Sequence, residues 1–209
     1  TRKPVISAKN LTVQYQSYQS FLEPSIITKA VNNITFFVQE GETLGIVGES
    51  GCGKSTLART LTGLVSMTEG NVTYADEDIL TLITQQRYQK DVQIIFQDPL
   101  SSLNPRMTIG DSIAEPLLVF EPELSKQERL DRVLPLLNDV GLLPDMINRY
   151  PHEFSGGQCQ RISIARSIIS HPKILICDEP VSALDVSIQA QIIDLLLSLK
   201  NKYNLTMLF

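Results

Sequence analysis

The sequence predicts an α/β protein in which helices cover a central sheet of mostly parallel strands. Residues 43–47 (TLGIV) form a short apolar run that leads through a glycine-rich turn directly into a helical pattern. Two further apolar runs, at 92–96 and 174–178, have the composition of strands that are covered on both faces. Between these runs, residues from about 109 to 170 carry apolar residues at helical spacing. We therefore expect a helical lobe inserted between two strands of the core.

The remaining elements flank this core. Residues 5–15 and 31–38 have strand composition, and the polar stretch between them is long for a hairpin loop. Another strand is expected at 71–75, and residues 186–200 predict an amphipathic helix near the end of the chain.

Composition and charge narrow the class of protein. The 209 residues are 43% hydrophobic and 20% charged, with a net charge of −5, so a phosphate-backbone partner such as nucleic acid is not expected. No apolar run reaches the length of a membrane span, and the start lacks a secretory pattern. We expect a cytoplasmic protein that reaches a membrane only through a partner. The cysteines are expected to be reduced thiols: Cys52, Cys159 and Cys177.

Residues 48–55 (GESGCGKS) match the phosphate-loop pattern G-x-x-x-x-G-K-[ST] between a strand and a helix. The glycines allow the backbone to curl with its N–H groups inward, and the lysine and serine supply a phosphate contact and a Mg²⁺ ligand. This pattern predicts a nucleoside triphosphate and Mg²⁺ but not the class of enzyme. We interpret the loop cysteine as a small filler residue rather than a redox switch. The predicted nucleotide-binding residues here are Gly48, Glu49, Ser50, Gly51, Cys52, Gly53, Lys54, Ser55 and Thr56, with Ser55 on the metal and Lys54 also catalytic.

Polar residues follow the two buried strands. Asp178 and Glu179 come directly after ILIC, where α/β sheets gather ligands. We expect Asp178 to hold Mg²⁺ and Glu179 to act as general base on the attacking water. Gln97, after VQIIF, is expected to contact both the metal and that water. The alternative is a pair of solvated strand ends.

A second glycine-rich turn lies at residues 154–158 (FSGGQ), before an amphipathic helix. Ser155 is the expected N-cap, and the glycines leave N–H groups exposed as a second anion site. Since one nucleotide does not need two such sites in one subunit, we expect two subunits to pair head to tail. Each turn would then cap the γ-phosphate of the partner through Ser155, Gly156, Gly157 and Gln158.

In this order of motifs the sequence resembles the ATP-binding cassette (ABC) ATPases, whose signature is usually L-S-G-G-Q; Phe154 replaces the leucine. The resemblance covers the whole chain and includes SALD at 182–185, which matches the dimer-facing D-loop and implies that Asp185 contacts the partner's nucleotide.

The resemblance implies a P-loop NTPase fold of the ABC ATPase type. It places a RecA-like core with an N-terminal antiparallel β-subdomain at 1–97 and 171–209, and an α-helical subdomain at 98–170. The resemblance also implies an aromatic ring near the N-terminus that stacks on the adenine. Tyr15 is the expected residue, with Tyr18 as the rival and core packing as the alternative role.

Several stretches resemble the oligopeptide, dipeptide and nickel importer branch, such as FQDPLSSLNPRMTIGDSIAEPL at 96–117. This resemblance implies a second ABC ATPase subunit, transmembrane permease subunits and, indirectly, a solute-binding protein as partners, at the cytoplasmic face of the membrane. The implied surface for a permease helix is Pro99, Leu103, Asn104, Pro105, Arg149, Tyr150 and His152. The alternatives are a soluble ABC ATPase acting on nucleic acid or ribosomes, an exporter, and a kinase or GTPase.

Members of the family have a histidine that contacts the γ-phosphate, and it lies in sequence just after the strand that here reads TMLF. Neither His152 nor His171 matches that position, and the sequence stops at Phe209 within an apolar run, so we expect it to be cut. The chain as given is therefore expected to bind ATP better than it hydrolyses it. Transported substrate is not encoded in this domain.

Overall fold

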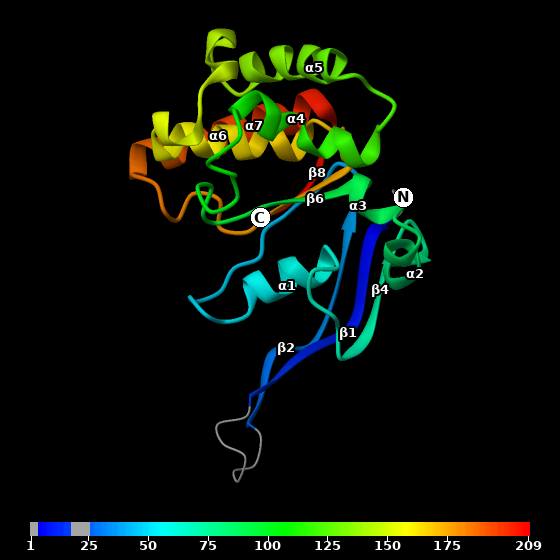
Figure 1. Ribbon diagram of the computed structural model, residues 1–209. Coiled ribbons are helices and arrows are strands. Elements are labelled where there is room, and N and C mark those ends of the chain that lie inside the picture. Colours follow the sequence, from blue (N-terminus) through cyan, green and yellow to red (C-terminus); the bar gives the residue numbers. More distant parts are fainter. Residues whose placement is uncertain (1–3, 18–25) are drawn as a thin grey trace. The chain divides into compact units, whose positions relative to one another are not determined.

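The computed structural model describes residues 4–17 and 26–209, which fall into two compact units (Figure 1). The first unit runs to Gln89 and includes Leu208–Phe209, and the second comprises Lys90–Met207. The domain boundaries predicted near residues 97 and 171 remain predictions.

The first unit is built on an antiparallel sheet with strand order β2-β1-β4-β5. Its strands are β1 (Pro4–Ser17), β2 (Ile26–Gln39), β4 (Glu69–Tyr74) and β5 (Glu77–Asp78). This confirms the N-terminal antiparallel sheet.

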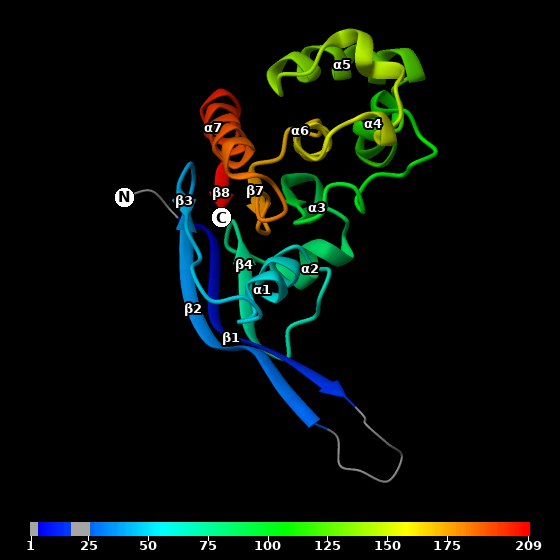
Figure 2. The same cartoon turned by 90° about the vertical axis from the view of Figure 1, so that its left-hand side faces the viewer.

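Strands β1 and β2 are longer than the sequence predicts. They pair from Pro4↔Gln39 to Ser17↔Ile26, so they continue as a two-stranded ribbon past the end of β4 (Figure 2). Residues 26–29 are exposed on both faces of this ribbon. Without a buried face there is no apolar alternation to reveal the strand.

Four short elements complete the first unit: β3 (Thr43–Leu44), α1 (Lys54–Leu61), α2 (Ile79–Thr84) and α3 (Tyr88–Asp91), the last of which crosses its boundary. Strand β3 is shorter than predicted, although the Ile46 amide continues its pairing by donating to the Phe209 carbonyl at 2.7 Å. Helix α1 buries Leu57, Ala58 and Leu61, and the fully buried Tyr88 donates its hydroxyl to the Leu61 carbonyl at 2.6 Å. Helix α1 is thereby fixed on its apolar face.

The second unit contains the helices predicted for its part of the chain. They are α4 (Ile109–Phe120), α5 (Lys126–Asp139), α6 (Gly156–Ile168) and α7 (Val186–Tyr203), with 3₁₀ turns at Pro144–Asn148 and Pro151–Glu153. Strand β6 (Val92–Ile95) pairs in parallel with the fully buried β7 (Ile174–Cys177). Strand β8 (Thr206–Leu208), whose last residue belongs to the first unit, adjoins β7. The predicted inner strands are confirmed.

Side-chain caps and an apolar core define these helices. Thr108, Ser125 and Ser155 each accept a backbone N–H at the start of α4, α5 and α6. Ile113, Leu137, Ile162, Leu175 and Leu196 are almost fully buried in one cluster. Burying a side chain of this size contributes about 1.5–3 kcal/mol, so the core fixes the helices around β6 and β7.

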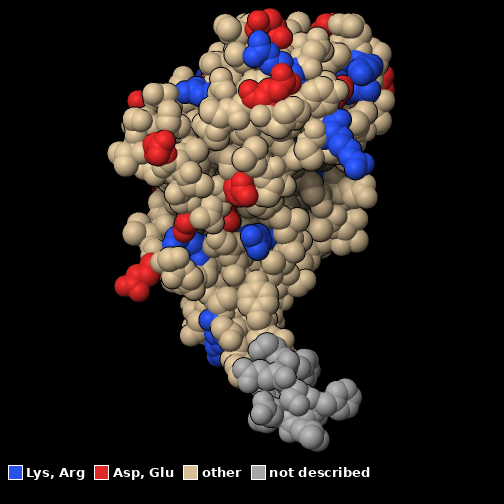
Figure 3. Space-filling view, turned by 60° about the vertical axis from the view of Figure 1, so that its left-hand side comes forward, with Lys and Arg blue, Asp and Glu red and all other residues tan. Residues whose placement is uncertain are grey.

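None of the helices among the described residues combines the length and the apolar character that a bilayer span requires. On the face shown in Figure 3, basic side chains lie among acidic ones and most of the surface is uncharged.

Candidate functional site

The loop between β3 and α1 places glycine where other residues do not fit. Gly53, the N-cap of α1, has φ +101°, and a Cβ there would stand 2.0 Å from the Ala30 carbonyl oxygen of β2. Gly51 has φ +79°, and a Cβ on Gly48 would stand 2.4 Å from Cys52 Sγ. The backbone turn of residues 48–53 therefore depends on Gly51 and Gly53, whereas a side chain at Gly48 would only require the Cys52 side chain to move.

Lys54 lies over this loop. Its Nζ donates to the carbonyl oxygens of Gly48 at 2.8 Å and Glu49 at 2.9 Å, and it stands 4.0 Å from Cys52 Sγ. The first turn of α1, with Ser55, adds backbone N–H groups and the positive end of the helix dipole. Positive charge is thus gathered at one end of one helix, as a phosphate site requires.

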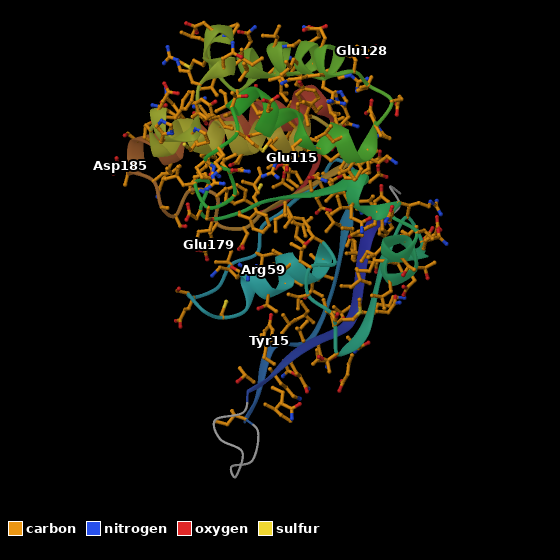
Figure 4. The ribbon with its side chains drawn as sticks, in the orientation of Figure 1. Tyr15, Arg59, Glu115, Glu128, Glu179 and Asp185 are labelled. Carbon is orange, nitrogen blue, oxygen red and sulfur yellow. The ribbon has the colours of Figure 1, made fainter. Side chains whose placement is uncertain are left out.

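Tyr15 lies on β1 beside the same helix (Figure 4). Its hydroxyl is 3.5 Å from Thr56 Oγ1, in the first turn of α1, and the residue is 44% exposed. Its ring is therefore both anchored near the phosphate loop and open to a ligand. The rival residue, Tyr18, lies outside the described residues.

The predicted metal and water residues lie at the carboxyl ends of β6 and β7. The parallel register pairs Ile95 with Cys177, and the Asp178 amide donates to the Ile95 carbonyl at 2.9 Å. Gln97 and Glu179 each lie two residues beyond a paired residue, so they occupy equivalent places on neighbouring strands. The structure places these residues at neighbouring strand ends, and their metal and water roles stay predictions.

The surroundings of the two acids differ. Asp178 is 5% exposed, whereas Glu179 is half-buried and has φ +47°. Positive φ is uncommon for a residue other than glycine and is often kept at functional positions. The Ser182 N–H and hydroxyl both donate to the Glu179 carbonyl, at 3.2 and 3.1 Å, and hold this backbone turn.

The signature turn starts α6 as expected. Ser155 Oγ accepts the Gln158 N–H at 3.3 Å, and the Gln158 side chain accepts the Ser155 N–H at 3.0 Å, which forms a capping box. The two glycines then begin the helix. Because their amides are at its first turn, no intrahelical carbonyl is available to them.

The signature glycines lie against the segment that follows Glu179. A Cβ on Gly157 would stand 2.8 Å from Ile188 Cγ2, and a Cβ on Gly156 would stand 3.6 Å from Leu184 Cδ2. The Gln189 side chain donates to the carbonyls of Val181 at 2.9 Å and Leu184 at 3.0 Å, which fixes this segment. The signature turn and the residues leading to α7 are thus one packed structure.

Asp185 is the N-cap residue of α7, and it is exposed (Figure 4). Its carboxylate makes no side-chain capping hydrogen bond to that helix. The carboxylate is therefore not committed to holding the helix in place.

This arrangement of motifs agrees with the comparisons to known proteins. The protein family described as ABC transporter matches residues 31–182, which is more than half of the chain. This chain belongs to the ABC transporter family. Its fold is accordingly the P-loop ABC ATPase fold, as the sequence predicted.

The curated relatives of this ABC protein include transport proteins. It is 54% identical over 213 residues to the oligopeptide transport ATP-binding protein OppF of Salmonella typhimurium, with 100% of this chain and 64% of that protein covered. It is 45% identical over 207 residues to the di/tripeptide transport ATP-binding protein DppF of Pseudomonas aeruginosa, covering 98% and 64%. The chain thus spans slightly less than two thirds of these relatives.

A solved structure has the same fold. The dimeric post-hydrolysis state of the ATP-binding cassette MJ0796 bound to ADP and Pi matches with a TM-score of 0.83 and 30% identity, covering 97% of this chain and 86% of that one. The family and this neighbour support nucleotide binding and membership of an ATPase class.

The expected permease surface of this ABC protein is only partly exposed. Pro99 and Leu103 are buried, whereas Tyr150 is 40% exposed and its ring stacks on His152 at 6.0 Å between centroids. Near Tyr150, the second unit has a groove of about 300 Å³. The groove is lined by Arg106, Met107, Thr108, Asp111, Ala114, Leu118, Lys126, Arg129, Leu130 and Tyr150.

Sequence reasoning missed the residues that support the motifs. Ala30 limits the space at Gly53, Ile188 limits it at Gly157, and Gln189 fixes the loop before α7. These residues are ordinary strand and helix residues by composition. Only their place in three dimensions identifies them.

Proposed function

We propose that this chain is the ATP-binding and ATP-hydrolysing domain of a subunit that drives peptide import through an ABC transporter. The observation that carries the proposal is the match to OppF and DppF proteins over 98–100% of this chain and 64% of those relatives, in a chain that retains each motif in place. Nickel or another small solute is the alternative cargo within this branch.

The residues of the first unit fit a nucleotide. The glycine turn that Ala30 and Cys52 confine, together with the Lys54 ammonium, supports the phosphates, and Tyr15 offers its ring to the adenine. Bound ATP with Mg²⁺ supplies the phosphoanhydride bond and the charge neutralisation for its cleavage. In this unit Ser55 carries an oxygen ligand of the kind that Mg²⁺ prefers, and in the second unit Gln97 and Asp178 do.

Glu179 is the proposed general base. It accepts a proton from water at its carboxylate, and Gln97, at the equivalent place on the neighbouring strand, orients that water. The rigid tie between Asp178 and Ile95 keeps these two side chains in register. Catalysis by this chain is therefore positioning and charge stabilisation.

The signature turn is proposed to act on a second subunit. Ser155, Gly156, Gly157 and Gln158 present the start of α6 to the partner's γ-phosphate, and Asp185 faces the same partner. The dimeric state of the MJ0796 neighbour supports this assignment. Closure of such a dimer around ATP and its release after hydrolysis would switch the transporter between two states.

The remaining partners are proposed from the family. We place permease subunits on the groove beside Tyr150 and a solute-binding protein beyond them, with this subunit at the cytoplasmic face of the membrane.

Reconstitution tests the proposal. The full-length subunit should join its permease subunits in liposomes and hydrolyse ATP faster when a peptide-loaded binding protein is added, with peptide uptake. ATP turnover that no solute stimulates, or recovery of the protein with RNA instead of permeases, would overturn it.

A further inference from the structure

Gln160 has a buried side-chain amide that pairs with no group of the described residues. It lies in α6, two residues beyond the signature glutamine Gln158, and is 0% exposed. Neither its Nε2 nor its Oε1 has a hydrogen-bond partner within residues 4–17 and 26–209. Native proteins rarely leave a buried side-chain amide unpaired, because it loses its bonds to water and gains none. The free-energy cost of this unpaired amide therefore suggests that Gln160 has a functional role.

Helix geometry places Gln160 on a stripe that begins at the signature turn. Residues three, four and seven apart share one face of a helix, so Gln160 shares a face with Gly156. Gly156 lies against Leu184, since a Cβ added there would stand 3.6 Å from Leu184 Cδ2. The first residue of this stripe on α6 therefore packs against the segment that leads from Glu179 to α7.

The other end of the same stripe contacts β6 and the segment after Gln97. Ser163 Oγ lies 3.0 Å from Ser102 Oγ, and Ser167 Oγ donates to the Ile94 carbonyl at 3.2 Å. Gln160 lies between these contacts and Gly156. Along this face of α6, Gln160 therefore lies between the residue that contacts Leu184 and the residue that contacts Ser102.

In this conformation the segment after Gln97 pairs its polar groups elsewhere. Ser101 Oγ donates to the Asp98 carbonyl at 3.0 Å, and Ser102 Oγ donates to the Pro99 carbonyl at 2.7 Å. Arg166 donates to the Ser102 carbonyl at 2.6 Å. Any shift of this segment breaks some of these bonds and frees backbone groups beside α6. A side-chain amide both donates and accepts hydrogen bonds, so it is suited to pair with these freed backbone groups.

We propose that Gln160 is a positioning residue for the Gln97 segment. Its amide is unpaired in the conformation described here and hydrogen-bonds the backbone of residues 98–103 when Gln97 engages bound nucleotide. The unpaired amide disfavours the conformation described here, and the new bonds favour the one in which Gln97 engages nucleotide. This inference rests on the proposed function as an ATPase.

Gln160→Met tests it in the full-length protein, because methionine keeps the length of the side chain and removes both polar atoms. Without nucleotide, the melting temperature should stay unchanged or rise. The rise in melting temperature on adding Mg-ATP should shrink, and kcat for ATP should fall about tenfold with KM within about twofold.

Ser112→Ala is the matched control, because Ser112 Oγ in α4 is also buried and unpaired within the described residues. It should leave the Mg-ATP shift and kcat unchanged. If Gln160→Met lowers both melting temperatures equally, or prevents folding, the amide stabilises the conformation described here and the inference is wrong. An unchanged Mg-ATP shift and kcat would also overturn it. Failure of the unsubstituted protein to hydrolyse ATP would instead refute the proposed function.

Discussion

The Asp178 N–H donates a 2.9 Å hydrogen bond to the Ile95 carbonyl, and this bond joins β6 and β7 at the point where their functional residues begin. Neighbouring strands lie about 4.8 Å apart, so equivalent residues beyond the bond stay close together. Gln97 and Glu179 are such residues. The geometry suits one group that orients a water molecule and one that removes its proton.

Glu179→Gln should therefore abolish turnover and retain ATP binding. The amide keeps the shape of the side chain but does not accept the proton, and loss of a general base typically costs 10²–10⁴-fold in rate. We expect ATP affinity within about threefold of the unsubstituted protein and a longer-lived ATP-bound dimer, measured by titration and size-exclusion chromatography. Glu123→Gln, an exposed acid on the loop after α4, should have no effect. Near-normal hydrolysis by Glu179→Gln would exclude the base assignment.

Three glycine-to-alanine variants should form a graded series around the phosphate loop. At Gly45 a Cβ meets no atom of the described residues within 4 Å, at Gly51 the same holds but φ is +79°, and at Gly53 φ +101° combines with the Ala30 oxygen at 2.0 Å. Left-handed backbone costs an alanine about 1–2 kcal/mol, and a backbone clash adds to this. Melting temperature and ATP affinity should fall in the order Gly45, Gly51, Gly53. Equal effects at all three positions would contradict this account.

Tyr15→Phe and Tyr15→Ala separate ring stacking from the hydroxyl contact with Thr56. Stacking needs only the aromatic face, so Phe should keep ATP affinity within about twofold, while Ala should lose about 2- to 10-fold. Binding of a fluorescent ATP analogue measures both. If the Phe variant loses as much affinity as the Ala variant, the 3.5 Å hydroxyl contact matters more than the ring.

Much of this fold was predictable because each motif carries its own local signal. The glycines at 48–53, the Ser155 cap and the apolar runs of β6 and β7 all encode their structure within a few residues. The extension of β2 to Ile26 was not predictable, because an exposed ribbon has no apolar alternation. The contacts of Ala30 with Gly53 and of Ile188 with Gly157 were not predictable either, since they join residues far apart in sequence.

Glu121 should make stability depend on pH. Burial opposes its ionisation, but hydrogen bonds and charge from Arg132 at 2.5 Å and Lys90 at 3.5 Å outweigh burial and lower the pKa of the Glu121 carboxyl. A pKa lowered by folding stabilises the protein above the unfolded-state value, and the gain disappears as pH falls through the folded-state value.

Glu121→Gln should therefore cost at most about 1 kcal/mol at pH 7, since both cations are about 40% exposed and screened by solvent. Urea denaturation at pH 7 and in acid should show the difference from the unsubstituted protein shrinking toward low pH. High salt at pH 7 should reduce the same difference. A difference that grows on acidification would mean that the carboxyl is held in its protonated form instead.

Gly157→Ala should destabilise the signature turn through Ile188. The added methyl would stand 2.8 Å from Ile188 Cγ2, and a β-branched side chain in a helix has little freedom to move aside. Overpacking of this kind costs about 1–3 kcal/mol, partly offset by the better helix propensity of alanine. At Gly156 the nearest atom, Leu184 Cδ2, is 3.6 Å away, so Gly156→Ala should leave the melting temperature unchanged or raise it.

A double-mutant cycle with Ile188→Ala isolates the contact. Removing the Ile188 methyl opens the space, so Gly157→Ala should cost less in that background, with a coupling energy of at least about 0.5 kcal/mol in denaturant titrations. Additive effects would show that the 2.8 Å approach is not what excludes a side chain at Gly157. In that case, only the need for a ligand to reach the start of α6 would explain the glycine at position 157. Gly156→Ala and Gly157→Ala should then weaken ATP-dependent dimerisation equally.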